Sequence, residues 1–157
     1  MTSDQDLAAV AREIVDSNLY MTLATSDGDG NPWPSPVWYA HAGYTEFLWV
    51  SRPDARHSRN LATRPQLGIV IFDSTAGVGA AQAIYVKAVA EELSGADRDG
   101  AIAVYSRRSE TLGARQWTRA DVTSPAPHRL YRATASAHFV LDANDRRVLV
   151  NAADSAR

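Results

Sequence analysis

Residues 50–61 carry the side chains of this sequence that are best suited to binding an anion. They place a hydroxyl at the end of an expected strand, and then three arginines and a histidine around the start of a short expected helix. The residues in question are Val50, Ser51, Arg52, Arg56, His57 and Arg59. Guanidinium groups and the free backbone N–H groups of a helix N-terminus both stabilise a phosphate dianion. The segment is therefore chemically suited to a phosphate, although an ordinary solvent-exposed basic face of a helix is the commoner origin of such a group of residues.

The remaining sequence predicts mostly antiparallel strands that would position this segment. Apolar residues recur at helical spacing between Leu7 and Ile14, which predicts a first helix. Alternating patterns and turn residues predict strands over 19–24, 35–41, 46–51, 67–72, 83–93, 128–141 and 147–150. We also expect a short helix within 52–64 and helical pieces from 96 to 122, broken at Gly113.

This order of elements predicts an α+β fold that is mainly antiparallel β, because a doubly wound sheet needs regular alternation of strands and helices. A closed or nearly closed barrel would also remove the strand edges that so many antiparallel strands otherwise expose. The 157 residues, of which 45% are hydrophobic and 22% charged, are expected to form a single domain over residues 1–157.

Composition and charge exclude several classes of function. A formal net charge of −2 provides no broad positive surface for nucleic acid, so any anion site must be local. The chain has no cysteine, and its four histidines are too scattered to predict a metal cluster. Neither a signal-peptide pattern nor an apolar run of about 18 residues is visible. We therefore expect a cytoplasmic protein without a membrane segment.

Four short motifs follow one another along the chain, at Leu23–Pro32, Arg56–Leu61, Arg64–Leu67 and Val89–Leu93. Each motif alone is degenerate, but their order and spacing resemble those of the pyridoxamine 5′-phosphate oxidase-like family. The resemblance covers residues 19–93, with a weaker echo at 128–132. It implies a split β-barrel with flanking helices, of the kind that binds FMN, and a homodimer whose interface completes the cofactor site.

The resemblance also implies roles for individual residues. Val50 and Ser51 would lie by the cofactor phosphate or ribityl chain, and Arg56 and His57 would be the basic pair that grips the phosphate. Further cofactor contacts are implied for Ser35, Pro36, Val37 and Trp38 along the isoalloxazine, for Arg52 and Arg59, and for Gln82 from the partner subunit. No catalytic side chain is expected, because a flavin carries the hydride chemistry while the protein supplies orientation and polarity.

This sequence departs from true pyridoxamine phosphate oxidases at several of these positions. Ser35 and Ala40 stand where those enzymes carry an arginine and a lysine, and His57 replaces a lysine. Their C-terminal substrate motif is not recognisable, so synthesis of pyridoxal phosphate is not expected. The leading hypothesis is an FMN-dependent oxidoreductase acting on a small molecule. The alternatives are an F420-dependent reductase of the same fold, a split barrel that binds flavin or haem for storage or sensing, and a structural homodimer with an empty cleft.

Overall fold

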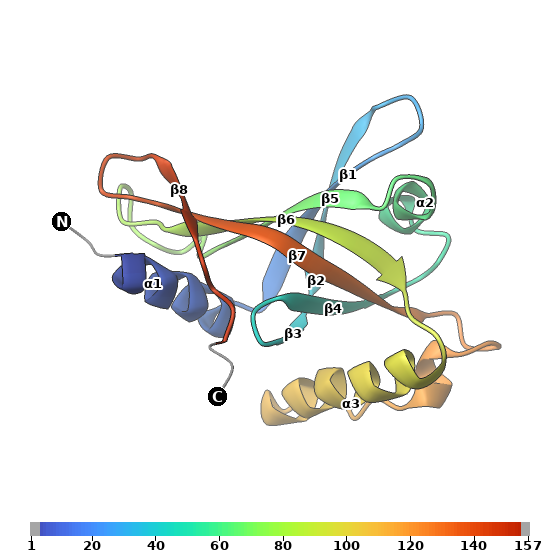
Figure 1. Ribbon diagram of the computed structural model, residues 1–157. Helices are drawn as coiled ribbons and strands as arrows, with labels where there is room; N and C mark the ends of the chain where they lie inside the picture. The colour runs from blue at the N-terminus through green and yellow to red at the C-terminus, as the bar shows by residue number, and fades with distance from the viewer. Residues whose placement is uncertain (1–3, 155–157) are drawn as a thin grey trace.

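The computed structural model describes residues 4–154, which form a curled antiparallel sheet with three α-helices around it (Figure 1). The helices are α1 (Asp4–Ser17), α2 (Arg56–Thr63) and α3 (Gly95–Thr111), with a 3₁₀ turn at Arg119–Val122. The strands are β1 (Tyr20–Ser26), β2 (Pro32–Trp38), β3 (Ala40–Ala42), β4 (Glu46–Ser51), β5 (Gln66–Phe72), β6 (Ala83–Glu92), β7 (Arg129–Leu141) and β8 (Arg147–Val150). The predicted α+β split barrel is confirmed.

The sheet closes on itself because its two end strands are neighbours in the chain. The strand order is β2-β1-β5-β6-β7-β4-β3, with β8 paired to β7, and every pairing is antiparallel. Only Tyr39 separates β2 from β3, so the two ends of the sheet must meet. The Tyr39 side chain is fully buried, and its hydroxyl donates a hydrogen bond to the Val15 carbonyl oxygen at 2.5 Å. This tyrosine therefore fixes the bend to the end of α1.

The barrel stays split between β2 and the second half of β4. β3 pairs with β4 only over Glu46–Leu48, so within the described chain Trp49–Ser51 have a strand partner, β7, on one edge alone. β2 pairs with β1 and contains prolines at alternate positions, namely Pro32, Pro34 and Pro36. Because proline has no N–H, these residues cannot donate to β1 and must face the free edge of β2. That edge therefore lacks N–H donors over Pro32–Pro36, which disfavours pairing of this part of β2 with β4.

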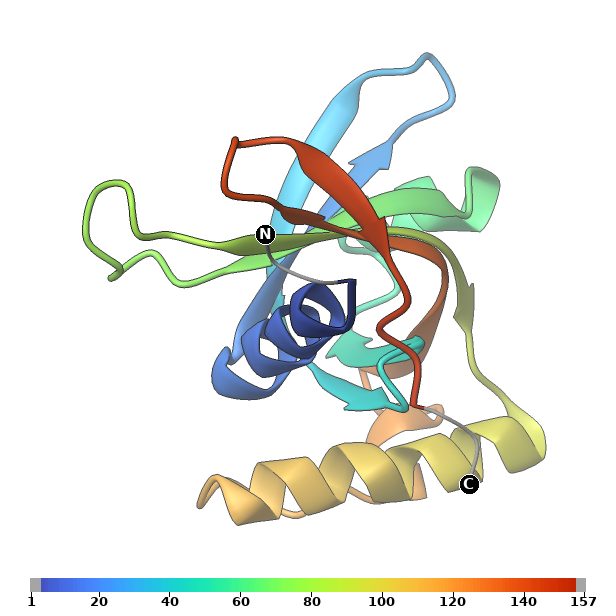
Figure 2. The same ribbon diagram turned by 60° about the vertical axis from the view of Figure 1, so that its left-hand side comes forward.

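Helices cover two sides of the barrel (Figure 2). Buried residues of α1 join the main core inside the curled sheet, together with Tyr39, Phe47 and Trp49. A second, smaller core lies between α3 and the strands β3, β4 and β7, where Leu48, Tyr105 and Leu130 are buried. None of the helices in the described residues is both long and apolar enough to cross a membrane.

Most of the predicted elements are present, with two differences at their boundaries. The strand expected at 35–41 begins earlier, at Pro32, because prolines are tolerated on an edge strand. It is interrupted at Tyr39, where the chain passes from β2 to β3. The helical stretch expected over 96–122 divides into α3 and the 3₁₀ turn. Gly113, the predicted break, has a φ of +76° just after α3 ends, which is a conformation that favours glycine.

Candidate functional site

Helix α2 begins without a side-chain cap. Ala55 occupies the N-cap position, and no side chain accepts a hydrogen bond from the first turn. The Arg59 N–H donates to the Ala55 carbonyl oxygen at 3.0 Å, so the N–H groups of the three preceding helical residues have no partner within the helix. The first turn contains no acidic residue and carries Arg56 and His57 instead. Positive charge at a helix N-terminus is unfavourable by roughly 0.3–1 kcal/mol, so a bound anion would satisfy both the free donors and the charges.

Ser51 and His57 lie together beside this helix N-terminus. The His57 Nε2 atom is 2.9 Å from Ser51 Oγ, and both side chains are half-buried. Burial lowers the pKa of His57 below its ordinary value of 6.5, so the free protein holds a neutral ring at neutral pH. The pair thus places a hydroxyl and a neutral imidazole next to the uncapped turn, where both can form hydrogen bonds to a phosphate.

The three arginines of the segment differ in their partners. Arg52 is paired with Asp54, with 3.0 Å between Nε and Oδ1, and both side chains are more than half exposed. The Arg56 guanidinium lies over the Trp33 ring, 4.3 Å from the ring centroid. Arg59 is exposed and lies three residues after Arg56, on the same side of α2. Of the three arginines, Arg56 and Arg59 are therefore the two whose charge is not paired with a carboxylate in a salt bridge.

A buried hydrogen-bonded chain fixes α2 to the β1–β2 hairpin. The Asn60 side-chain amide donates to Thr25 Oγ1 at 3.0 Å, and that hydroxyl donates to the Trp33 carbonyl oxygen at 3.2 Å. Asn60 and Thr25 are both buried. Asn60 lies within a motif noted in the sequence, but it was not expected to act in the site. The sequence feature that could have indicated this role is an amide side chain in the expected helix, directly before Leu61, which is buried in the core.

Replacement of Asn60 by alanine is expected to lower the free energy of unfolding by about 1–3 kcal/mol, because Thr25 loses a donor inside the protein and a cavity forms. Urea denaturation followed by tryptophan fluorescence would measure the change. Gln66→Ala removes an exposed amide near the same helix and should change the stability by less than about 0.5 kcal/mol. Equal midpoints for N60A and the wild type would contradict this role.

The four candidate residues of β2 do not share one environment. Ser35 and Val37 are buried on the core side of the strand, whereas Pro36 is exposed. Trp38 is half-buried and packs edge-on against Tyr105 of α3, with ring centroids 4.9 Å apart. The Tyr105 hydroxyl in turn interacts with the Val50 backbone. Trp38 thus takes part in the packing of α3, a contact that periodicity alone does not predict.

Gln82 lies far from α2 in the same chain. β5 starts three residues after α2 and runs away from it for seven residues, and Gln82 immediately precedes the returning strand β6 (Figure 1). At about 3.3 Å per residue, this separates the two by roughly 20 Å. One chain therefore brings together Ser51, Arg56 and His57 but does not bring Gln82 to them.

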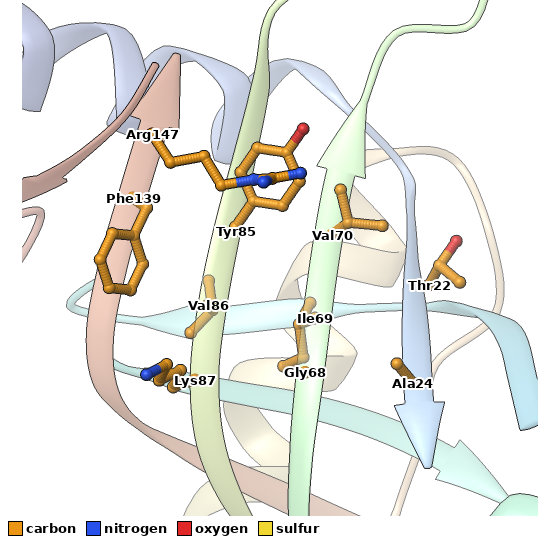
Figure 3. Close-up of a pocket in the computed structure, with 10 residues that line it drawn as sticks. All are labelled: Thr22, Ala24, Gly68, Ile69, Val70, Tyr85, Val86, Lys87, Phe139 and Arg147. Atoms are coloured by element: carbon orange, nitrogen blue, oxygen red, sulfur yellow. The ribbon is translucent and has the colours of Figure 1, made fainter. Parts of the chain in front are cut away.

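The outer face of the sheet carries an apolar hollow of about 520 Å³ (Figure 3). Its lining comes from five strands and consists of Thr22, Ala24, Gly68, Ile69, Val70, Tyr85, Val86, Lys87, Phe139 and Arg147. Two charged side chains lie at its border over aromatic rings, Arg147 at 4.5 Å from the Tyr85 centroid and Lys87 at 5.8 Å from that of Phe139. Gly68 has no side chain and Ala24 has only a methyl group, so little fills the hollow at these two positions.

This hollow belongs to a larger apolar face. Strand alternation places four exposed side chains on the same side of the sheet, and these are Tyr20, Phe72, Val89 and Leu149. A second hollow of about 510 Å³ shares Ala24, Gly68 and Lys87 with the first and extends to Pro32 at the start of β2. The face therefore continues from the middle of the sheet to the hairpin that contacts α2. We call the residues that line the two hollows, together with these four exposed side chains, the outer apolar face.

Comparison with known proteins finds relatives with this fold. A haem-binding protein from Mycobacterium smegmatis superposes with a TM-score of 0.74 at 23% identity, covering 93% of this chain and 58% of that one. The chain thus spans little more than half of that relative's length. An F420 reductase matches with a TM-score of 0.60 at 17% identity, over 81% of this chain and 94% of the other. A FAD-binding protein from Mesorhizobium loti matches with a TM-score of 0.61 at 20% identity, over 85% and 92%.

These identities are low, and the likeness shows a shared fold whose members differ in what they bind. A search of curated proteins finds no significant match. The family model described as pyridoxamine 5′-phosphate oxidase, in contrast, matches residues 7–142, which is most of the chain. The chain belongs to the pyridoxamine 5′-phosphate oxidase family.

Proposed function

We propose that this protein is a flavin-dependent oxidoreductase that binds FMN as a homodimer. The observation that carries the proposal is the uncapped N-terminus of α2, which bears cations and lies beside the Ser51 hydroxyl. Arg56, His57 and Arg59 would hold the phosphate together with Ser51 and the free N–H groups. A bound flavin would accept and donate hydride. The donor set suits a phosphate ester, because charge-assisted hydrogen bonds and a helix N-terminus act on one dianion.

A second copy of the chain is the partner that best fits the outer apolar face. A contiguous exposed apolar face that is rimmed by charged side chains is typical of an interaction site. The face runs up to the β1–β2 hairpin, so a subunit seated on it would lie next to the split and to α2. A two-fold contact would also give each α2 site neighbours from the other chain, and the family resemblance implies that Gln82 is one of them. The cofactor site is therefore proposed to be complete only in the dimer.

Titration of the purified protein with FMN and riboflavin tests the phosphate site directly. We expect FMN to bind at least tenfold more tightly than riboflavin, as followed by quenching of flavin fluorescence. The bound flavin should then be reduced by a nicotinamide nucleotide and reoxidised by an added acceptor over many cycles. Equal affinities for the two flavins would overturn the phosphate site, and binding without turnover would overturn the enzymatic part of the proposal.

Binding of FMN near pH 7.5 is expected to take up protons at His57. The buried ring has a pKa below its ordinary value in the free protein, whereas a neighbouring phosphate dianion favours the protonated ring and raises that pKa. Between these two values, affinity should increase as the pH falls. Calorimetry in two buffers with different ionisation enthalpies would measure the uptake, and His57→Gln should abolish it. Release of protons by the wild type would contradict the assignment.

Two alternatives within the family remain to be tested in the same way. Arg52 and Arg59 offer additional cations for the longer anionic tail of F420, so F420 belongs in the titration. Storage of haem without turnover is favoured by His128, which is half-exposed and, within the described chain, makes no side-chain hydrogen bond. Haem binding that is lost in His128→Ala, together with weak flavin binding, would support that second function.

A further inference from the structure

We propose that Trp33 is a stacking subsite for an adenine ring attached beyond the flavin phosphate, so that the protein prefers FAD to FMN. This inference rests on the proposed phosphate site. Trp33 is 41% exposed, although Ser35 and Val37 on the same side of β2 are buried. A large indole left in solvent on an otherwise covered strand face presents a flat apolar surface. Such a surface suits a planar base, because every base has a face that can stack.

The indole lies directly next to the cations of the phosphate site. The Arg56 guanidinium covers part of the ring at 4.3 Å from its centroid and leaves the remainder accessible. The backbone of Trp33 is held in place, because its carbonyl accepts a hydrogen bond from Thr25, which in turn is bonded to Asn60 of α2. The platform is therefore fixed to the helix that would bind the phosphate, and little conformational freedom is lost when a ring stacks on it.

The position of Trp33 along β2 indicates which part of a cofactor would reach it. β2 (Pro32–Trp38) runs from the tip of the hairpin toward α3 (Figure 1). Trp33 is its second residue, and Trp38 at its other end packs against Tyr105 of α3. The family resemblance would place the isoalloxazine along residues 35–38. With the phosphate at α2, Trp33, which contacts Arg56, would then lie beyond the phosphate. FMN ends at that phosphate, whereas FAD continues through a second phosphate to adenine. Arg59, exposed on the same side of α2 as Arg56, would serve the second phosphate.

Parallel titrations of the wild type, Trp33→Ala and Trp33→Phe with FAD and FMN test the subsite. The wild type should bind FAD about tenfold more tightly than FMN, which corresponds to about 1.4 kcal/mol. In W33A the two affinities should become equal while that for FMN changes by less than about twofold, and W33F should keep most of the preference. Trp117→Ala is the matched control, because Trp117 also stacks with an arginine, Arg115, at 4.3 Å but belongs to the α3 region.

Each outcome decides between distinct conclusions. Equal binding of FAD and FMN by the wild type, or an unchanged preference in W33A, would overturn the adenine subsite and leave the phosphate site standing. A parallel loss of both flavins in W33A would also overturn it, since Trp33 would then act only by positioning Arg56. Failure of the wild type to bind either flavin would overturn the proposed function, and the subsite with it. Thermal melting of each variant confirms that the affinities are those of folded protein.

Discussion

Replacing Arg56 and His57 together by alanine is expected to weaken FMN binding by about a hundredfold or more. Each residue would contribute a hydrogen bond to a charged phosphate, and such bonds are worth about 1.5–3 kcal/mol each. Riboflavin binding should change little, because riboflavin lacks the phosphate. Fluorescence titration would measure the affinities for FMN and riboflavin. The difference between the two binding free energies gives the contribution of the phosphate group.

The fold should tolerate this double substitution. Arg56 is exposed, and His57 makes its hydrogen bond to Ser51 rather than to the core. Removing the Arg56 guanidinium also takes unfavourable positive charge away from the start of α2, so the melting temperature should not fall by more than a few degrees. Arg146→Ala is the control, because it removes an exposed arginine from the turn between β7 and β8, at the opposite end of β7 from the residue that pairs with Ser51, and it should leave FMN affinity unchanged. An unaltered FMN affinity in the double variant at Arg56 and His57 would refute the site.

The sequence predicted the elements of the split barrel because its apolar periodicity is local information. The alternation in β5 and β6, and the change of pattern between Arg52 and Arg64, mark strands and a helix without any knowledge of their neighbours. The clustering of Ser51 with His57 was also predictable, since both lie in one short segment. Local pattern was therefore sufficient wherever a contact spans only a few residues.

Contacts between distant segments could not be obtained in this way. The partner of Thr25 is Asn60, and Trp38 packs against Tyr105. Periodicity shows which side of a strand is covered but not what covers it. The meeting of β2 and β3 at Tyr39 likewise depends on the whole strand order. Gln82, which the resemblance assigns to the site of the partner subunit, lies far from α2 in its own chain.

The distance between Gln82 and α2 within one chain links flavin binding to dimerisation through the outer apolar face. If the cofactor site needs groups from two chains, then a change that prevents dimerisation should also abolish tight flavin binding, even when it touches no residue of the α2 cluster. Val70 offers a suitable position, because it lines the hollow from β5 and is only half-buried in one chain. A charge there would remain solvated in the monomer and would be buried without a partner in the dimer.

Val70→Arg is therefore expected to shift the protein from dimer to its 17.0 kDa monomer, with a loss of more than about 3 kcal/mol in association free energy, and to weaken FMN binding in parallel. Light scattering during size-exclusion chromatography and flavin titration would measure both effects. Leu112→Arg places the same charge at an exposed apolar position after α3 and should leave the dimer intact. A monomeric V70R that binds FMN like the wild type would show that one chain completes the site, and a dimeric V70R would move the interface elsewhere.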